Sequence, residues 1–178
     1  MWLSRRHLAI AALAAAALAA MLAAGWWAGG AISGAGARPA PAPQLRYTLL
    51  DGRQLLTSDL LGQVVLVNFW ATSCAVCVAE MPALVAMHEK YRGQGYQTLA
   101  VAMQYDPPAR VFDFATRRQL PFGVVIDNTG AIARGFGDVQ VTPTSFLINK
   151  RGDIVYRFQG APDLPALHKR VARLLAET

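Results

Sequence analysis

The only two cysteines of this 178-residue sequence, Cys74 and Cys77, are separated by two residues. They follow a nearly continuous apolar run at residues 64–69, which predicts a buried strand, and they begin a stretch with helical spacing. A helix N-terminus lowers the pKa of a thiol, because its free N–H groups and the helix dipole favour the thiolate. A second thiol one turn later can attack the mixed disulfide that the first one forms. The pair therefore predicts thiol–disulfide exchange, with Cys74 as the attacking thiol and Cys77 as the resolving thiol.

A pair of cysteines at this spacing could also bind a metal ion. Zinc would need two further ligands at a comparable spacing, but the histidines are His7 in the N-terminal segment and His88 and His168 on expected helix surfaces. We therefore expect no metal and no cofactor. A copper(I) metallochaperone stays open as an alternative of another class. Copper(I) binding would require a Met or His near the thiols as a further ligand. The candidates are Met81 and Met103, and both are expected in the core.

The elements that must hold the cysteines can be read from periodicity and turn signals. Expected strands cover residues 45–50, 54–56, 64–69, 97–102, 122–126, 144–148 and 154–158, and expected helices cover residues 74–92, 106–118, 129–136 and 164–176. This alternation, closed by a hairpin and a helix, predicts an α/β fold with a central mixed β-sheet flanked by helices. The first two strands predict an N-terminal β-hairpin, and Phe112, Phe114 and Phe122 are expected in the core.

The N-terminal segment predicts membrane targeting. Arg5 and Arg6 precede residues 8–37, which carry no charge, and a helix over residues 8–27 would span about 30 Å, enough to cross a bilayer core. The arginines favour a cytoplasmic N-terminus. We expect a retained signal anchor at residues 1–28. A cleaved signal peptide is the alternative, since the Ala-Gly-Ala sequence at residues 35–37 resembles a cleavage site.

Residues 29–43 are rich in Gly, Ala and Pro and predict a linker, which leaves residues 44–178 for the catalytic domain. With either fate of the N-terminal segment, this domain is expected on the far side of the membrane. The formal net charge of +6 includes Arg5 and Arg6, and the other basic residues are not clustered with aromatic ones. No nucleic-acid binding is therefore expected.

Two stretches of the sequence resemble known ones. Residues 68–77 (NFWATSCAVC), continued by EMP at residues 80–82, resemble the active-site stretch of the TlpA/ResA/CcmG family of membrane-anchored extracytoplasmic proteins. Residues 141–144 (VTPT) match that family's cis-proline loop. The resemblance covers residues 44–176 and implies a thioredoxin-like fold.

The resemblance also implies roles for residues around the cysteines. Thr142 and Pro143 are expected to form a substrate-binding loop with a cis peptide bond, facing the cysteines. Trp70 could belong to the wall of the site, where it would contact substrate, or to the core. Glu80 is expected to be a partly buried general acid–base for Cys77, because Asn68 stands where thioredoxin itself has a buried Asp. The alternative for Glu80 is an exposed acid that favours the helix start.

The function implied by the resemblance is reduction of disulfides in periplasmic client proteins, either apocytochrome c or copper-site assembly proteins. A membrane electron donor of the DsbD/CcdA type would re-reduce the cysteines. The expected location is the bacterial inner membrane, with a single-pass anchor and a periplasmic catalytic domain, or the soluble periplasm after signal cleavage. A disulfide-forming oxidase on the same fold stays open, because the direction depends on the reduction potential and the partner.

Two departures from the family pattern bear on that question. Ser73 stands where the family usually has Trp, and the dipeptide Ala75-Val76 does not end in Pro. The first changes the surface beside the attacking thiol, and the second changes a dipeptide that helps to set the potential. Both leave the client and the potential open.

Overall fold

The computed structural model describes residues 39–177, which belong to one compact unit. The expected anchor at residues 1–28 and most of the expected linker at residues 29–43 lie outside the described residues. Within residues 39–177, no helix has the length and apolar character needed to cross a membrane.

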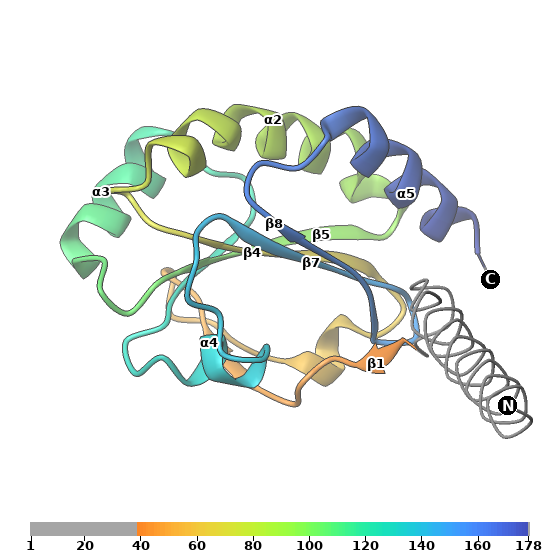
Figure 1. The fold of residues 1–178 in the computed structure, drawn as a ribbon, viewed down its shortest axis with the longest axis horizontal. Coiled ribbons are helices and arrows are strands. Elements are labelled where there is room, and N and C mark those ends of the chain that lie inside the picture. The colour runs from red at the N-terminus through yellow and green to blue at the C-terminus, as the bar shows by residue number, and fades with distance from the viewer. Residues whose placement is uncertain (1–38, 178) are drawn as a thin grey trace, which may run out of the picture. The chain divides into compact units, whose positions relative to one another are not determined.

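The core of the domain is a six-stranded mixed sheet (Figure 1). Its strands are β1 (Ala40–Pro41), β4 (Val64–Trp70), β5 (Tyr96–Ala102), β6 (Gly123–Ile126), β7 (Thr144–Ile148) and β8 (Asp153–Gln159), in the order β1-β8-β7-β4-β5-β6. Strands β4, β5 and β6 are parallel, whereas β7, β8 and β1 add to the sheet by antiparallel pairing. The predicted mixed sheet is thereby confirmed.

Helices cover both faces of this sheet. They are α2 (Ala75–Tyr91), α3 (Pro108–Arg117), α4 (Ala131–Gly135) and α5 (Leu164–Ala176), with short 3-10 turns at η1 (Thr57–Leu60) and η2 (Arg92–Gln94). Figure 1 shows α2, α3 and α5 on one side of the sheet and α4 on the other. The expected layers are therefore present, and α5 has the predicted bounds.

Strand β4 lies at the centre of the sheet, between β7 and β5, and all seven of its residues are buried. Alternate residues contribute to two hydrophobic clusters, one with Leu66 and Trp70 beneath α2 and one with Val67 and Phe69 on the opposite face. Burial on both faces explains the continuous apolar run. Asn68 shares the α2 side with Leu66 and Trp70, because side chains alternate along a strand.

The predicted N-terminal hairpin is present as β2 (Arg46–Thr48) and β3 (Gln54–Leu56), which pair antiparallel. The structure also contains a strand that the sequence did not predict. Residues Ala40–Pro41, expected in the linker, pair with β8, and the Ala42 N–H donates to the Gly152 carbonyl at 2.8 Å. The folded domain therefore begins several residues before Gln44.

Two expectations about side-chain exposure were wrong. His88, expected on a helix surface, is buried against the rings of Tyr96 and Phe122, because α2 turns this residue towards β5 and β6. Phe112, expected in the core, is 54% exposed. Helix α3 directs Val111 and Phe114 inward, and a residue one step from Val111 is rotated about 100° away from that face.

Candidate active site

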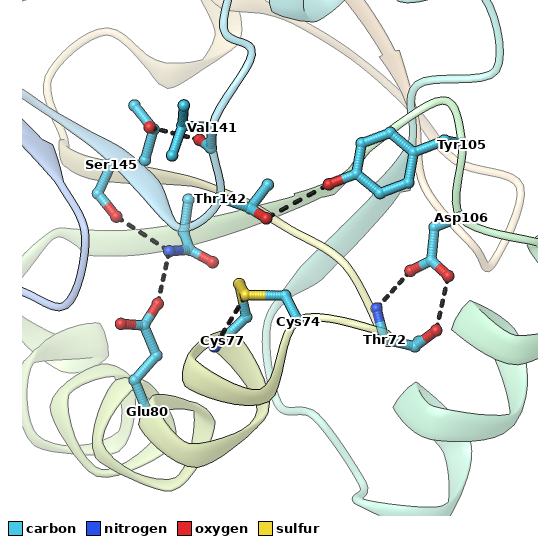
Figure 2. The surroundings of a disulfide bond; sticks show 11 residues. Thr72, Cys74, Cys77, Glu80, Tyr105, Asp106, Val141, Thr142 and Ser145 are labelled. Carbon is cyan, nitrogen blue, oxygen red and sulfur yellow. Dashed lines mark hydrogen bonds between the residues drawn. A yellow bond between two sulfur atoms is a disulfide. The ribbon is translucent and has the colours of Figure 1, made fainter.

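The two cysteines lie at the N-terminus of α2 and form a disulfide bond (Figure 2). Cys74 is the N-cap residue of the helix, and its sulfur accepts a hydrogen bond from the Cys77 N–H at 3.2 Å. Cys74 is half-buried, whereas Cys77 has no exposed surface. A partner protein can therefore reach Cys74 more easily than Cys77. The expected position at the start of a helix is confirmed.

The cis-proline loop lies opposite the cysteines (Figure 2). The Thr142–Pro143 peptide bond is cis, as the resemblance implied. Pro143 is buried and its carbonyl accepts from the Gly160 N–H at 2.8 Å, whereas Thr142 is half-exposed. Since Thr142 lies beside the disulfide and is open to solvent, contact with a substrate stays a prediction that this geometry allows.

Glu80 lies on α2 one turn beyond Cys77 and is buried, with 8% of its surface exposed. The Asn68 side-chain amide donates to Glu80 Oε1 at 3.1 Å and to Ser145 Oγ at 2.9 Å. Glu80 Oε2 is buried without a hydrogen-bond partner. Burial raises the pKa of Glu80 to about 7, and the Asn68 hydrogen bond opposes that rise. The exposed helix-start alternative is wrong, since the carboxyl group is directed inward.

Trp70 lies beneath the site and not in its wall. Its side chain is fully buried and packs against Phe114, with ring centroids 5.1 Å apart. A docked substrate cannot touch a side chain without exposed surface. The substrate-contact alternative for Trp70 is therefore corrected to a core position.

Two residues near the cysteines were missed by the reading of the sequence. Asp106 is buried, and its carboxylate accepts from the N–H and the hydroxyl of Thr72 (Figure 2). Tyr105 is exposed, and its hydroxyl lies 3.3 Å from Thr142 Oγ1. Neither residue is near Cys74 in the sequence, and the pattern of Asp106 in front of two prolines predicts only the start of a helix.

The two methionines considered as copper(I) ligands belong to the hydrophobic clusters of the core, Met81 on the α2 side of the sheet and Met103 on the other. Met81 and Met103 are buried in the core, as expected. Within the part of the chain that the structure describes, no three His, Cys, Asp or Glu side chains are grouped in a way that could hold a metal ion.

Comparison with known proteins gives consistent matches. The model of the Redoxin family matches residues 36–173. The chain is 34% identical over 119 residues to the thiol-disulfide oxidoreductase ResA of Bacillus thuringiensis subsp. konkukian, covering 67% of this chain and 68% of that protein. It is 37% identical over 113 residues to ResA of Geobacillus thermodenitrificans, covering 64% of each. Among solved structures, a thioredoxin-family thiol:disulfide interchange protein from Chlorobium tepidum superposes with a TM-score of 0.72 at 26% identity, covering 80% of this chain and 100% of that one.

Proposed function

The chain belongs to the Redoxin family as a ResA-like thiol–disulfide oxidoreductase, and we propose that it reduces disulfide bonds in client proteins outside the cytoplasm. The observation that carries this proposal is the unequal burial of the two sulfurs, with Cys74 half-exposed at the helix start and Cys77 enclosed behind it. Three cavities of the described residues, of about 530, 390 and 380 Å³, are not lined by either cysteine. A reactive sulfur at the surface, and not inside a cavity, can be reached by a disulfide bond in another polypeptide.

The proposed reaction transfers two electrons from the chain to its client. In the reduced protein, the Cys74 thiolate attacks one sulfur of the client disulfide and forms a mixed disulfide, while the other client sulfur leaves as a thiolate. The Cys77 thiolate then attacks the Cys74 sulfur. The Cys74–Cys77 disulfide forms, and the client's second sulfur leaves as a thiolate. The disulfide in the structure corresponds to the chain at the end of this reaction.

Glu80 would accept the proton that Cys77 must lose before the second attack. Burial disfavours the Cys77 thiolate, so a nearby base is needed. A carboxyl group with a pKa of about 7 is suited to accept and return a proton at neutral pH. Thr142 and Pro143, on the opposite side of the disulfide, would hold the client segment while its sulfur is attacked.

The clients would be apocytochrome c or copper-site assembly proteins, and a membrane donor of the DsbD/CcdA type would restore the two thiols. The paired arginines and the uncharged segment at residues 8–37 support a periplasmic domain attached to the bacterial inner membrane. Cleavage of that segment would instead release the domain into the periplasm. Capture of clients on a Cys77→Ala variant, followed by their identification, tests whether the clients are apocytochrome c or copper-site assembly proteins.

The direction of the reaction is tested by the reduction potential of the Cys74–Cys77 pair. We expect an equilibrium potential more negative than about −210 mV, which is the lower end of the range typical of an oxidising compartment. A potential near the value of about −120 mV found for a strong oxidant would support the disulfide-forming alternative. Analysis of copper bound to the reduced protein, in the same preparation, distinguishes the reductase and the oxidase from a copper(I) metallochaperone, which would bind copper through the two thiols.

A further inference from the structure

The loop that leads into the cysteines is held by a residue from another part of the chain. Asp106 follows β5, and its carboxylate accepts two hydrogen bonds from Thr72, one from the N–H at 2.5 Å and one from the hydroxyl at 2.6 Å (Figure 2). Thr72 precedes Cys74 by two residues. Both oxygens of Asp106 are thus directed at one residue of the active-site loop.

The position of Asp106 is not explained by charge pairing or by capping of α3. Its side chain is only 2% exposed, and the ion pairs found among residues 39–177 do not include it. The N-cap of α3 is Pro107, without a side-chain hydrogen bond to the helix start. A buried carboxylate is costly unless donors satisfy it. The two donors that satisfy Asp106 both come from Thr72, so its burial depends on the shape of the active-site loop.

The same loop determines where the Cys74 sulfur lies. The Cys74 N–H donates to the Ala71 carbonyl at 3.1 Å, which closes a tight turn around Thr72, and the Cys74 sulfur accepts from the Cys77 N–H. A thiolate in that position is stabilised by the first turn of the helix. Any loosening of Thr72 would let the sulfur move away from this N–H.

We propose that Asp106 is a positioning residue for Cys74: by holding Thr72, it keeps the sulfur at the start of α2, where the thiolate is stabilised. This inference rests on the proposed role of Cys74 as the attacking thiol. It deepens that role, because it assigns part of the reactivity of Cys74 to a residue 32 positions further along the chain.

The negative charge of Asp106 by itself would destabilise the Cys74 thiolate, whereas the proposed positioning stabilises it. A negative charge near a thiol disfavours the thiolate and raises the pKa of the thiol. The other titratable groups around Cys74 are Cys77 and Glu80 on α2 and Tyr105 beside Asp106, and the facing residues 140–144 contain none. The direction in which a variant moves the Cys74 titration therefore separates positioning from simple repulsion.

The test is the rate of alkylation of Cys74 by iodoacetamide against pH in the reduced protein, with the modified residue identified by mass spectrometry. We expect Thr72→Val to slow alkylation at pH 7 by about two- to fivefold, the range that corresponds to interactions at a helix terminus. The midpoint of the profile should move to higher pH. Thr72→Ser, which keeps the hydroxyl, should restore the wild-type profile. Asp106→Asn should shift the midpoint in the same direction as Thr72→Val, although it removes a negative charge.

Thr57→Val is the matched control. Thr57 is buried directly after the N-terminal hairpin, and its hydroxyl, like that of Thr72, donates to an oxygen of another segment, the Pro43 carbonyl at 2.7 Å. It should lower the melting temperature without moving the alkylation profile. An unchanged profile in Thr72→Val, or a shift to lower pH in Asp106→Asn, would overturn the proposal. If Thr72→Val does not fold, Asp106→Asn decides the question. Alkylation of Cys77 first in the wild-type protein would instead contradict the proposed function.

Discussion

The side-chain amide of Asn68 donates a hydrogen bond to Glu80 Oε1 at 3.1 Å, and both residues are buried beneath the cysteines. An amide can hold a carboxyl group in place but cannot take its proton. Glu80 is therefore the titratable member of this pair, with its pKa raised by burial to about 7. At neutral pH the group is about half ionised.

The raised pKa of Glu80 makes the stability of the domain depend on pH. The folded protein keeps the Glu80 proton up to about pH 7, whereas the unfolded chain releases it near 4.5, so stability falls as pH rises between these values. Glu80→Gln keeps the size and removes the titration. We expect the variant to be more stable than wild type at pH 8, by up to about 3 kcal/mol, and the advantage to shrink towards pH 4.5. Urea unfolding of the oxidised proteins across this range measures it.

Glu89→Gln provides a control on the same helix. Glu89 is exposed and pairs with Arg92 at 2.9 Å. Loss of a surface ion pair changes stability by about 1 kcal/mol or less, so Glu89→Gln is not expected to reproduce the gain in stability at pH 8. An advantage of Glu80→Gln that is the same at pH 5 and pH 8 would show that Glu80 does not titrate in this range.

The Glu80→Gln variant also tests the proposed role of Glu80 in proton transfer. We expect Glu80→Gln to slow disulfide reduction near pH 7 by about a hundredfold, the typical contribution of a positioned general base. The difference should narrow in alkali, where Cys77 ionises without help. Rates against pH for both proteins give the answer. Parallel curves would mean that Glu80 contributes no proton transfer.

Trp70→Phe tests the core position of Trp70. The smaller ring leaves a cavity next to Phe114, and we expect a loss of stability of about 1–3 kcal/mol. The KM for a protein disulfide should be unchanged, because no atom of Trp70 is exposed to a client. A raised KM in a variant that melts like wild type would indicate that Trp70 contacts the substrate in the wall of the site.

The unpredicted strand β1 gives a further prediction. A chain that begins at Gln44 lacks the Ala42 hydrogen bond to Gly152 and the Pro43 carbonyl that accepts from Thr57. We expect it to be about 2 kcal/mol less stable than a chain that begins at Pro39, since a hydrogen bond contributes about 1 kcal/mol. Urea midpoints compare the two. Equal midpoints would indicate that residues 39–43 act only as a linker.

The elements that the sequence predicted are those marked by local signals. Strand β4 follows from a continuous apolar run, and α5 begins where Asp163 caps the helix and Pro165 occupies its first turn. The position of the two cysteines followed from the same kind of signal, a buried strand directly before a helical stretch.

The features that the sequence did not predict depend on distant partners. Strand β1 has two residues without periodicity, and it exists because β8 offers an edge to pair with. Asp106 acquires its role from Thr72, 34 residues away, and the burial of His88 depends on β5 and β6. Contacts between residues so far apart in the sequence cannot be predicted from the pattern of neighbouring residues.

The central claim, that Cys74 attacks a client disulfide and Cys77 resolves the intermediate, is tested most directly with single cysteine variants. Each reduced variant is mixed with a protein disulfide such as insulin at pH 7, and covalent complexes are followed by non-reducing electrophoresis and mass spectrometry. We expect Cys77→Ser to accumulate a mixed disulfide through Cys74, and Cys74→Ser to form almost none, because Cys77 has no exposed surface. A complex formed through Cys77 in Cys74→Ser, at a rate comparable with that of Cys77→Ser, would contradict the account.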